Sequence, residues 1–572
     1  MGSETFKLYF NEDNLNLAYH RVICWPERLV KDRFGIQAFA YDLQTNIKKL
    51  SHKLLTNSYS PQLGFKYYEP KSSGTQRTKT LLMIEDALVY QAIANIIAEK
   101  NYSLLAEHDD FVFGSVLTPE TRLGTALFKE DNPQFFFYKF WKNLFIRFKD
   151  SIIKAIEVDK ATFKFETDIT GFFDSIPHYN LLLTLSNNFN VEDEILDLLS
   201  ICLNAWSGTK ESNTPGVGIP QGPQPSYLLA NLLLYPLDKQ LISEAFKYYR
   251  YMDDIKIYGY SESELKDVLV LIDNYLKGHG LSINSKKTGI TLIEAGSEDQ
   301  TVKELKRFEV LGNDYAKEEI ILENLLDGLL ESNIVKDLLG LSDQSPEGDV
   351  NSNLKLDTLS ITEKEEIINF WLAEIKHVEE ELPKLFKSNS KELTIQEKID
   401  DIDFIRLSAK YGTSIRSLSE YQEIPANEAL LPYWLFAIKK FNWRANNFIL
   451  TLQHYKNHPG LKLELIKIYS SDKNYEWFRY HIINCLNYNF NFTDRELREF
   501  IKYLKSEDSE LVKYAIYCLI IKHTEDAQLQ STIRIQLSKE KTNYLKLITL
   551  NYWKSDKNRI QNLDDLIKQL GL

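Results

Sequence analysis

The sequence predicts an α+β fold in the first half of the chain and an all-α, helical-repeat arrangement in the second half. Two observations lead to this fold class. Between about residue 160 and residue 312, strand-like runs of β-branched and aromatic residues alternate with stretches of helical spacing. From about residue 315 onward, Pro and Gly become sparse and the apolar residues recur at helical intervals, as in residues 511–521.

Three parts follow from these patterns. Residues 1–150 mix helical periodicity with short aromatic-rich runs, residues 151–315 carry the alternating strands and helices, and residues 316–572 form the helical part. The polar stretch 341–353 contains Pro and Gly and few apolar residues, which predicts a loop or linker. We place the boundary between the second and third parts near this stretch.

The helical part shows no repeat of fixed period. Consecutive helices of about 12 to 18 residues with short polar gaps nevertheless suit an irregular solenoid of the HEAT kind, and an ordinary helical bundle is the alternative. Helix starts are indicated by the capping-box spacing, in which Ser or Thr is followed three residues later by Glu. The pairs at this spacing are Thr362 with Glu365, Thr394 with Glu397, Ser417 with Glu420, and Thr493 with Glu496.

The composition is that of a globular protein, since 44% of the 572 residues are hydrophobic and 26% are charged. The longest nearly uncharged apolar stretch, residues 226–237, is too short to cross a membrane, and the N-terminus lacks a signal-peptide pattern. We therefore expect a soluble, cytoplasmic protein that makes no membrane contact. The four cysteines show no zinc-ligand spacing, so we expect buried thiols.

The net charge of −13 argues against unspecific binding to nucleic acid, because phosphate contacts need locally concentrated Lys and Arg. Any contact with nucleic acid must therefore use a confined basic groove. The Lys- and Arg-containing segment 48–79 is one candidate, although a solvated loop surface explains its charge equally well.

Residues 249–259 place two adjacent acids, Asp253 and Asp254, between aromatic and β-branched residues. This pattern predicts a β-hairpin with carboxylates at its turn. Adjacent aspartates at a tight turn project in different directions, so one can bind a metal ion while the other supports it. A solvated turn is the alternative for this segment taken alone.

A second acidic segment, residues 163–177, is a strand-like run that ends in Asp168 and is followed by a turn and Asp174. An aspartate at the end of a neighbouring strand can share two Mg²⁺ ions with Asp253, about 3.5 to 4 Å apart, as phosphoryl-transfer sites require. Carboxylates suit Mg²⁺ because this hard cation prefers oxygen ligands.

With these segments the sequence resembles the reverse transcriptases over roughly residues 60 to 312. The palm domain of that family carries an Asp-containing strand, a Pro-Gln-Gly loop and a Tyr-x-Asp-Asp hairpin in this order. The loop corresponds to Pro220-Gln221-Gly222, and the Ser and Pro that follow it stand in the reverse of the usual order. Gly222 would let the backbone approach an incoming nucleotide closely, and the apolar run to Leu237 would be a helix beneath the sheet.

The resemblance implies a set of site residues and a cofactor. The cofactor is a pair of Mg²⁺ ions, for which Mn²⁺ can substitute. The implied metal-binding residues are Asp168, Ile169, Asp253 and Asp254. The implied catalytic residues are Asp168, Asp253, Asp254 and Lys287, and the residues implied to bind the deoxynucleotide (dNTP) are Arg77, Lys79, Phe173, Gln221 and Gly222.

Lys287 enters this set because residues 280–288 are similar to the next motif of the family. Its lysine would approach the leaving pyrophosphate as a charge stabiliser or proton donor. We choose Lys287 over Lys286, and an ordinary lysine at a turn is the alternative. Residues 310–312 fit loosely the short hairpin that grips a primer end.

Arg77 and Lys79 stand upstream of Asp86 in an arrangement that resembles the fingers motif, in which basic residues bind the triphosphate. The match is degenerate because the usual Pro is absent, and a solvated basic turn is the alternative. Phe173 stands five positions after the first catalytic acid, where the family places an aromatic residue beneath the sugar to exclude a 2′-hydroxyl. A phenylalanine packed in the core is compatible with the same position.

The combination of a reverse-transcriptase core with a long helical extension is similar to the bacterial abortive-infection reverse transcriptases, such as AbiK, and to related defence enzymes. The resemblance implies antiviral defence against phage, homo-oligomers, and the bacterial cytoplasm. In some members DNA synthesis is primed by a tyrosine and needs no template, so that the DNA product stays covalently attached.

Two alternatives remain open from the sequence. The first is an RNA-templated reverse transcriptase that works with a dedicated noncoding RNA, which the helical part would bind. The second is a non-catalytic scaffold that uses the helical concavity to hold a partner. The three acids disfavour the scaffold, because clustered carboxylates without a cation repel one another.

Overall fold

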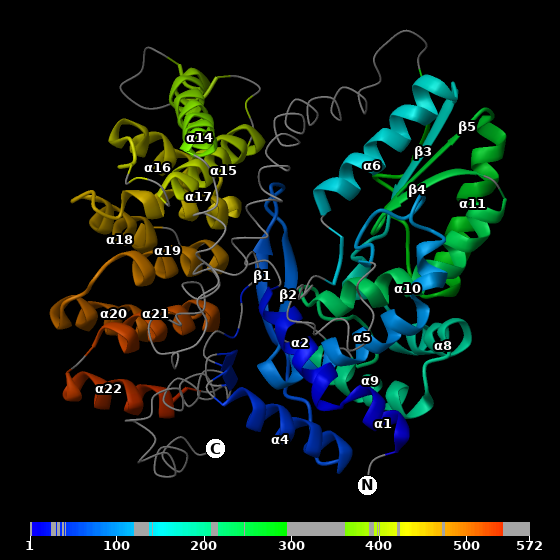
Figure 1. Ribbon diagram of the computed structural model, residues 1–572, viewed down its shortest axis with the longest axis horizontal. Coiled ribbons are helices and arrows are strands. Elements are labelled where there is room, and N and C mark those ends of the chain that lie inside the picture. Colours follow the sequence, from blue (N-terminus) through cyan, green and yellow to red (C-terminus); the bar gives the residue numbers. More distant parts are fainter. Residues whose placement is uncertain are drawn as a thin grey trace. The chain divides into compact units, whose positions relative to one another are not determined.

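The computed structural model describes residues 3–118, 137–293 and 361–540. Within these ranges it omits residues 25–29, 31, 33–34, 37–38, 41, 140, 208–214, 245, 388–393, 397–398, 400, 420–421, 423, 472–474 and 525. The chain divides into two units, shown in Figure 1. The first contains residues 1–66 and 78–330, and the second contains residues 67–77 and 331–572. The predicted linker at 341–353 and the predicted primer hairpin at 310–312 lie outside the described residues.

The first unit is built around a four-stranded antiparallel sheet with the strand order β4-β5-β3-β6. The strands are β3 (Phe163–Asp168), β4 (Lys247–Tyr251), β5 (Asp254–Gly259) and β6 (Gly289–Leu292). The register pairs Glu166 with Lys256 and Asp168 with Asp254 across β3 and β5. Because successive residues of a strand point to opposite faces, these four charged side chains share one face of the sheet.

Helices α10 and α11 contact strands of this sheet, and α10 is the helix predicted from the apolar run to Leu237. Helix α6 contacts β4, where the rings of Phe145 and Phe148 pack against Tyr251. The helices of this unit are α1 (Glu4–Tyr9), α2 (Glu12–Cys24), α4 (Leu43–Leu55), α5 (Ile84–Ala106), α6 (Trp141–Ile153), α7 (Phe172–Ser175), α8 (His178–Phe189), α9 (Asp193–Trp206), α10 (Gln224–Ser243) and α11 (Glu262–Gly278), and a π-helical turn, Lys154–Val158, follows α6.

A two-stranded hairpin, β1 (Phe65–Pro70) and β2 (Gln76–Leu81), precedes α5. The loop that leads into this hairpin is held by Asp86 in the first turn of α5. The buried Asp86 carboxylate accepts hydrogen bonds from the Tyr59 hydroxyl at 2.5 Å and from the Gln62 backbone N–H at 2.9 Å. Burial raises the pKa of Asp86 to about 7, although both hydrogen bonds lower it.

Asp86→Asn is expected to change how the stability of the first unit depends on pH. Because the folded-state pKa of Asp86 is raised, its contribution is fully present below about pH 4 and is lost as the pH rises through about 7. Between these values the variant should gain stability relative to the native protein by on the order of 4 kcal/mol. Urea unfolding of both proteins at the two pH values measures this change, and a constant difference would contradict it.

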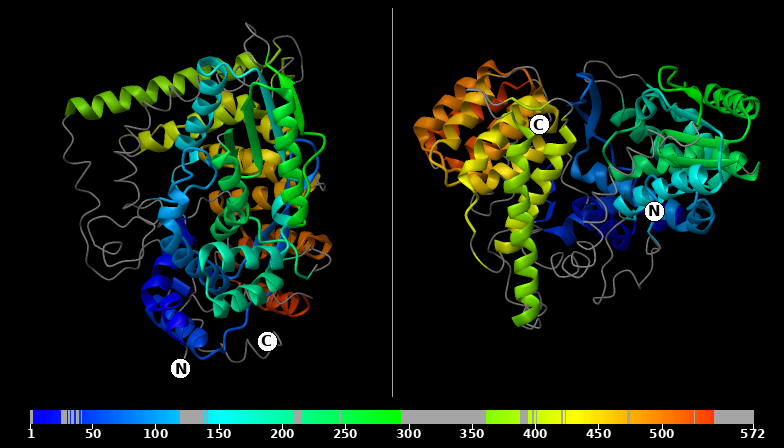
Figure 2. Two further views of the ribbon diagram at one scale, coloured as in Figure 1. Left: turned by 90° about the vertical axis from the view of Figure 1, so that its right-hand side faces the viewer. Right: turned by 90° about the horizontal axis from the view of Figure 1, so that it is seen from above.

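In its described residues 361–540, the second unit contains helices and one isolated β-bridge, so the predicted α+β fold with an all-helical C-terminal region is confirmed. Each helix of the series α15, α17, α19, α21 contacts the next one, and α16, α18 and α20 pack against α17, α19 and α21. This pairing of neighbours is typical of a helical solenoid. Figures 1 and 2 show these helices stacked in chain order from yellow to red. The helices are α14 (Ile361–Glu381), α15 (Asp401–Ser419), α16 (Leu431–Lys440), α17 (Ala445–Leu452), α18 (Leu461–Ser471), α19 (Glu476–Asn489), α20 (Asp494–Ser506), α21 (Glu510–His523) and α22 (Ala527–Ser538).

The capping-box predictions meet different outcomes. Thr493 and Glu496 form the reciprocal capping box at the start of α20. Ser417 lies instead in the last turn of α15, and Thr394 precedes a residue in a β-bridge, Ile395, so these two helix starts are wrong. Thr362 lies inside α14, which begins at Ile361.

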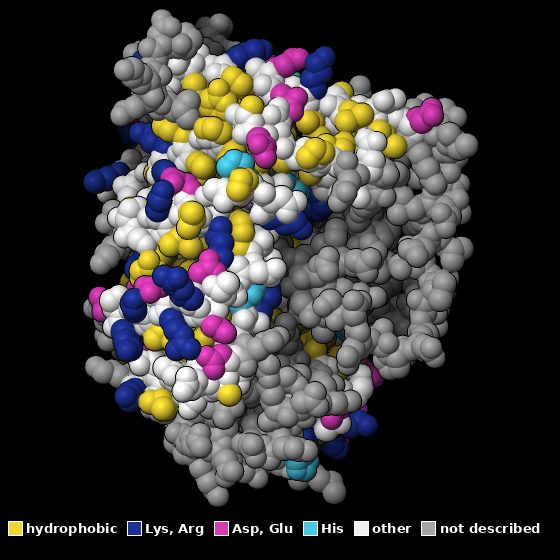
Figure 3. Space-filling model, turned by 90° about the vertical axis from the view of Figure 1, so that its left-hand side faces the viewer, with side chains coloured by type: hydrophobic (Ala, Val, Ile, Leu, Met, Phe, Trp, Pro, Cys, Tyr) yellow, Lys and Arg dark blue, Asp and Glu magenta, His cyan; other side chains and the backbone are white. Residues whose placement is uncertain are grey.

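Lys and Arg side chains on the face of the helical unit in Figure 3 are interspersed with Asp and Glu. Ion pairs within the helical unit include Lys439 with Glu464 at 2.8 Å and Lys462 with Glu496 at 2.5 Å. This face therefore presents mixed charge. Across the described parts of the chain, no helix has both the length and the apolar composition needed to span a membrane.

Candidate active site

The acids Asp168 and Asp253 meet at one end of the sheet. Asp168 is the last residue of β3, and Asp253 lies in the two-residue turn between β4 and β5. Burial and, after it, the nearby negative charge of Asp168 together raise the pKa of Asp253 to about 6. Burial likewise raises the pKa of Asp254, with Glu166 and Asp168 adding to the effect and Lys256 opposing it. The structure thus brings the three acids of the sequence prediction together.

Segment 281–288 lies against the end of β3 and adds a cation to the acid cluster. Ile283 forms a β-bridge with Ile169, and the Asn284 backbone N–H donates to the Asp168 carbonyl at 2.7 Å. The Lys287 ammonium donates to the Asp168 carboxylate at 2.9 Å, and the Asn284 side-chain amide donates to it at 3.2 Å. The lysine chosen from the motif is therefore the one that contacts a catalytic-site acid.

Glu166, Lys256 and Asn284 belong to this site and were missed from the sequence. The Lys256 ammonium donates to the Glu166 carboxylate at 2.5 Å and lies 3.8 Å from the carboxylate of Asp254. Burial raises the pKa of Glu166, but the charges and hydrogen bonds of Lys256 and Lys164 together outweigh burial and leave this pKa below its usual range. Strand alternation could have identified Glu166 and Lys256, because residues two apart in a strand share a face. Glu166 stands two residues before Asp168, and Lys256 stands two residues after Asp254.

The turn that carries Asp253 adopts an unusual backbone conformation. Met252 has φ +57°, a left-handed value that costs a residue with a side chain on the order of 1 to 3 kcal/mol. Gly114 packs against this turn so closely that a Cβ on it would lie 2.5 Å from the Met252 nitrogen. Segment 111–113 is hydrogen-bonded to the backbone of Arg250, whose backbone N–H donates to the Phe111 carbonyl at 2.8 Å.

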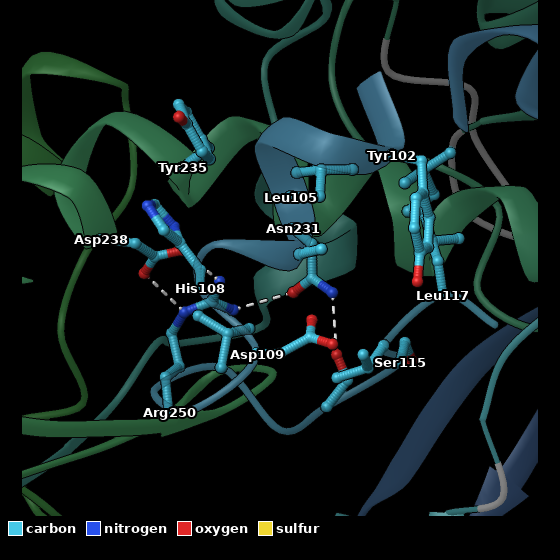
Figure 4. Close-up of a pocket in the computed structure, with 15 residues that line it drawn as sticks. Tyr102, Leu105, His108, Asp109, Ser115, Leu117, Asn231, Tyr235, Asp238 and Arg250 are labelled. Atoms are coloured by element: carbon cyan, nitrogen blue, oxygen red, sulfur yellow. Dashed lines mark hydrogen bonds and ion pairs between the residues drawn. The ribbon is translucent and has the colours of Figure 1, made fainter. Parts of the chain in front are cut away.

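Arg250 is fully buried and holds the turn from inside. Its guanidinium donates to the Met252 carbonyl at 2.8 Å, to Asn231 at 2.9 Å, and to both carboxylate oxygens of Asp238 at 2.8 and 2.5 Å. Burial lowers the pKa of Arg250, but the charge of Asp238, the Tyr248 hydroxyl and the hydrogen bonds to both together offset burial and raise this pKa overall. Figure 4 shows Arg250, Asp238 and Asn231 converging beside the pocket that His108 also lines. Asn231 in turn donates to the Gly114 carbonyl at 2.8 Å, so one network fixes both sides of the turn.

The Pro-Gln-Gly loop is tied to the segment that follows Asp168. The Ile219 N–H donates to the Phe173 carbonyl at 2.8 Å, and Gly222 has φ +136°, a value that favours glycine. The Gln221 carbonyl accepts a hydrogen bond from the Thr80 N–H of β2 at 3.0 Å. The Phe173 ring is 7% exposed and packs edge-to-face on Tyr227 with ring centroids 5.3 Å apart.

The two basic residues predicted to bind triphosphate differ in environment. Arg77 is exposed on the part of the hairpin that belongs to the second unit, whereas Lys79 is 7% exposed and belongs to the first unit.

Ile169 has a buried apolar side chain, so its backbone carbonyl is the group that could reach a metal ion.

A divalent cation fits the donor set at this site, although no three acidic, histidine or cysteine side chains of the described residues gather into a complete metal site. Mg²⁺ in phosphoryl-transfer sites usually takes one or two protein carboxylates and completes its shell with water and substrate phosphates. The raised pKa of Asp253 reflects first its burial and then the negative charge of Asp168 close to it, and a bound cation would relieve this repulsion.

Comparisons with known proteins identify one family match and several solved structures of low similarity. Residues 126–315 match the family described as "Reverse transcriptase (RNA-dependent DNA polymerase)". No curated relative matches the chain. Among solved structures, telomerase from Candida albicans in complex with a fragment of telomeric RNA is 11% identical with a TM-score of 0.32, and the match covers 80% of this chain and 64% of that one. Apo telomerase from Candida tropicalis is 12% identical with a TM-score of 0.31, over 90% of this chain and 69% of that one. Over residues 126–315 the chain thus matches the reverse transcriptase domain, a domain of RNA-directed DNA polymerases, which are nucleotidyltransferases.

Proposed function

We propose that the protein is a DNA polymerase of the reverse-transcriptase type that adds dNTPs at the site formed by Asp168, Asp253 and Asp254. The observation that carries this proposal is the convergence of Asp168 and Asp253 from segments far apart in the sequence, with Lys287 beside them. Asp168, Asp253, Asp254 and the Ile169 carbonyl would hold two Mg²⁺ ions, or Mn²⁺ in their place. When bound, the cations lower the pKa of the attacking hydroxyl and neutralise the leaving pyrophosphate.

The residues of the chain supply the remaining chemistry. Gln221 and Gly222 would offer their backbone to the incoming nucleotide, and Arg77 and Lys79 would meet the triphosphate. Phe173, packed against Tyr227, would close the space that a 2′-hydroxyl needs, which makes deoxynucleotides the substrate. Lys287 is 65% exposed, so its side chain can leave Asp168 and donate a proton to the departing pyrophosphate.

Lys287→Met is expected to lower kcat for dNTP incorporation by about 10²-fold, the usual contribution of a positioned general acid. Lys286→Met is the matched control, because Lys286 is exposed next to Lys287 and its backbone N–H donates to the Asn284 side chain at 3.3 Å. Steady-state incorporation of labelled dNTP by both variants measures the effect. Equal rates in the two variants would remove Lys287 from the proposed mechanism.

We further propose a role in antiphage defence by abortive infection in the bacterial cytoplasm, as a homo-oligomer. The sequence resemblance and the association of a reverse transcriptase domain with a helical unit support this proposal. Priming by a tyrosine without a template is chemically reasonable, since a phenolic oxygen can attack an α-phosphorus as a 3′-hydroxyl does. We keep the division into residues 1–150, 151–315 and 316–572 as part of the same proposal.

One experiment tests whether the protein incorporates dNTPs and whether the product is attached to the protein or depends on an added RNA. Purified, nuclease-treated protein is incubated with each labelled dNTP and Mg²⁺ and analysed on a denaturing protein gel. The proposal expects label that migrates with the protein for dNTPs and not for ribonucleotides. Incorporation that appears only after addition of a co-purifying RNA would favour the RNA-templated alternative, and no incorporation under either condition would favour the scaffold.

A further inference from the structure

The β1–β2 hairpin is shared between the two units of the chain. Its inner part, up to Lys66 and from Thr78, belongs to the first unit, whereas its outer part, residues 67–77, belongs to the second. The chain therefore crosses between the units within both strands of one hairpin. A restraint on the outer part is transmitted to the inner part through only a few residues of hydrogen-bonded strand.

The inner part of the hairpin is fixed to the candidate nucleotide site. The Lys66 ammonium is buried and donates to the Trp206 carbonyl and to the Thr80 hydroxyl, each at 2.6 Å. The backbone N–H of the same Thr80 donates to the Gln221 carbonyl at 3.0 Å. The Pro-Gln-Gly loop therefore takes its position partly from the inner end of β2.

The outer part of the hairpin is fixed inside the helical unit, at the N-terminus of α19. The Tyr67 ring stacks on Trp477 with centroids 5.9 Å apart and planes 4° apart, and both side chains are 1% exposed. The Tyr68 backbone N–H donates to the Glu476 carboxylate at 2.8 Å. Glu476 is itself buried, and its other carboxylate oxygen accepts from the Ser509 hydroxyl at the start of α21. A buried carboxylate thus joins the hairpin to two helices of the solenoid.

We propose that Glu476 and Trp477 are positioning residues for the incoming nucleotide and act through the hairpin on the Gln221 loop. This inference rests on the proposed function, because it takes the loop to be part of a dNTP site. In this proposal the helical unit helps to set the geometry of the nucleotide pocket. A change in structure at the start of α19 then changes the affinity for dNTP.

The test compares Glu476→Ala with two matched variants in the full chain. Glu476→Gln keeps an oxygen for the Tyr68 N–H, so it should behave nearly as the native protein. Ser509→Ala removes the hydrogen bond from the Ser509 hydroxyl to Glu476 and perturbs α21, but leaves the hydrogen bond from the Tyr68 N–H to Glu476 intact. Thermal unfolding verifies that each variant is folded.

Glu476→Ala is expected to raise KM for dNTP roughly tenfold with kcat unchanged, because a charge-assisted hydrogen bond that orders the hairpin is lost. Hydrogen exchange at the Thr80 amide should quicken in Glu476→Ala and stay native in Ser509→Ala. A native KM in Glu476→Ala, or an equal rise of KM in Ser509→Ala, would overturn the inference. If the native protein incorporates no nucleotide, the proposed function fails, while faster exchange at Thr80 still supports the coupling and unchanged exchange refutes it.

Discussion

Replacing Asp253 with Asn is expected to lower the rate of dNTP incorporation by roughly 10³-fold or more. The carboxylate lies at the turn between β4 and β5 beside Asp168, and the amide of Asn binds a divalent cation far more weakly. Loss of several kcal/mol of transition-state stabilisation corresponds to this factor. Incorporation of labelled dNTP under saturating Mg²⁺ measures it.

The same substitution should leave the fold intact, which separates it from a structural defect. Burial and the charge of Asp168 both raise the pKa of Asp253, so its charge is unfavourable in the folded protein and its removal relieves repulsion. Thermal unfolding of the cation-free variant should therefore occur at the native temperature or above it. Asp267→Asn, in an exposed position of α11, is the matched control. Retained incorporation in Asp253→Asn would contradict the assignment.

Arg250→Met is expected to produce the second large effect, on stability and on activity together. The substitution leaves Asp238 buried without its cation, which typically costs about 3 to 5 kcal/mol. It also removes the donor to the Met252 carbonyl, so the left-handed turn that carries Asp253 loses its support. Urea unfolding and dNTP incorporation of the same preparation measure the two losses.

The double variant Arg250→Met with Asp238→Leu separates these effects. Replacing both members of a buried ion pair by apolar side chains is often neutral or stabilising, so most of the stability should return. Incorporation should stay low, because no side chain then reaches the Met252 carbonyl. A double variant with native incorporation would show that Arg250 serves the fold alone.

Local sequence pattern was enough to predict the parts of the site that depend on neighbouring residues. Alternation around Asp253 and Asp254 predicted a hairpin, because the strand period is a property of a short segment. The helix over the apolar run to Leu237 was expected from the resemblance to the reverse transcriptases. The capping-box spacing was less decisive. It marks the start of α20 at Thr493, yet at Ser417 it falls in the last turn of α15, since the same residue types also occur within helices.

Contacts between distant segments could not be predicted from such patterns. The hydrogen bond from the Tyr68 backbone N–H to the Glu476 carboxylate joins residues about four hundred positions apart. Nothing in the sequence of the β1–β2 hairpin assigns its outer part to the helical unit. The buried pair of Arg250 and Asp238 left a weak signal, in that Asp238 ends an otherwise uncharged run. Burial of an arginine is explained only by the partner that tertiary structure brings to it.

The central claim is that Asp168 and Asp253 together hold the divalent cations of a polymerase. Titration of the purified protein with Mn²⁺, followed by the electron paramagnetic resonance signal of the free ion, tests it without any assumption about primer or template. The account predicts saturable binding in the native protein that is lost in both Asp168→Asn and Asp253→Asn and retained in Asp267→Asn. Equal Mn²⁺ binding by the native protein and the two site variants would contradict it.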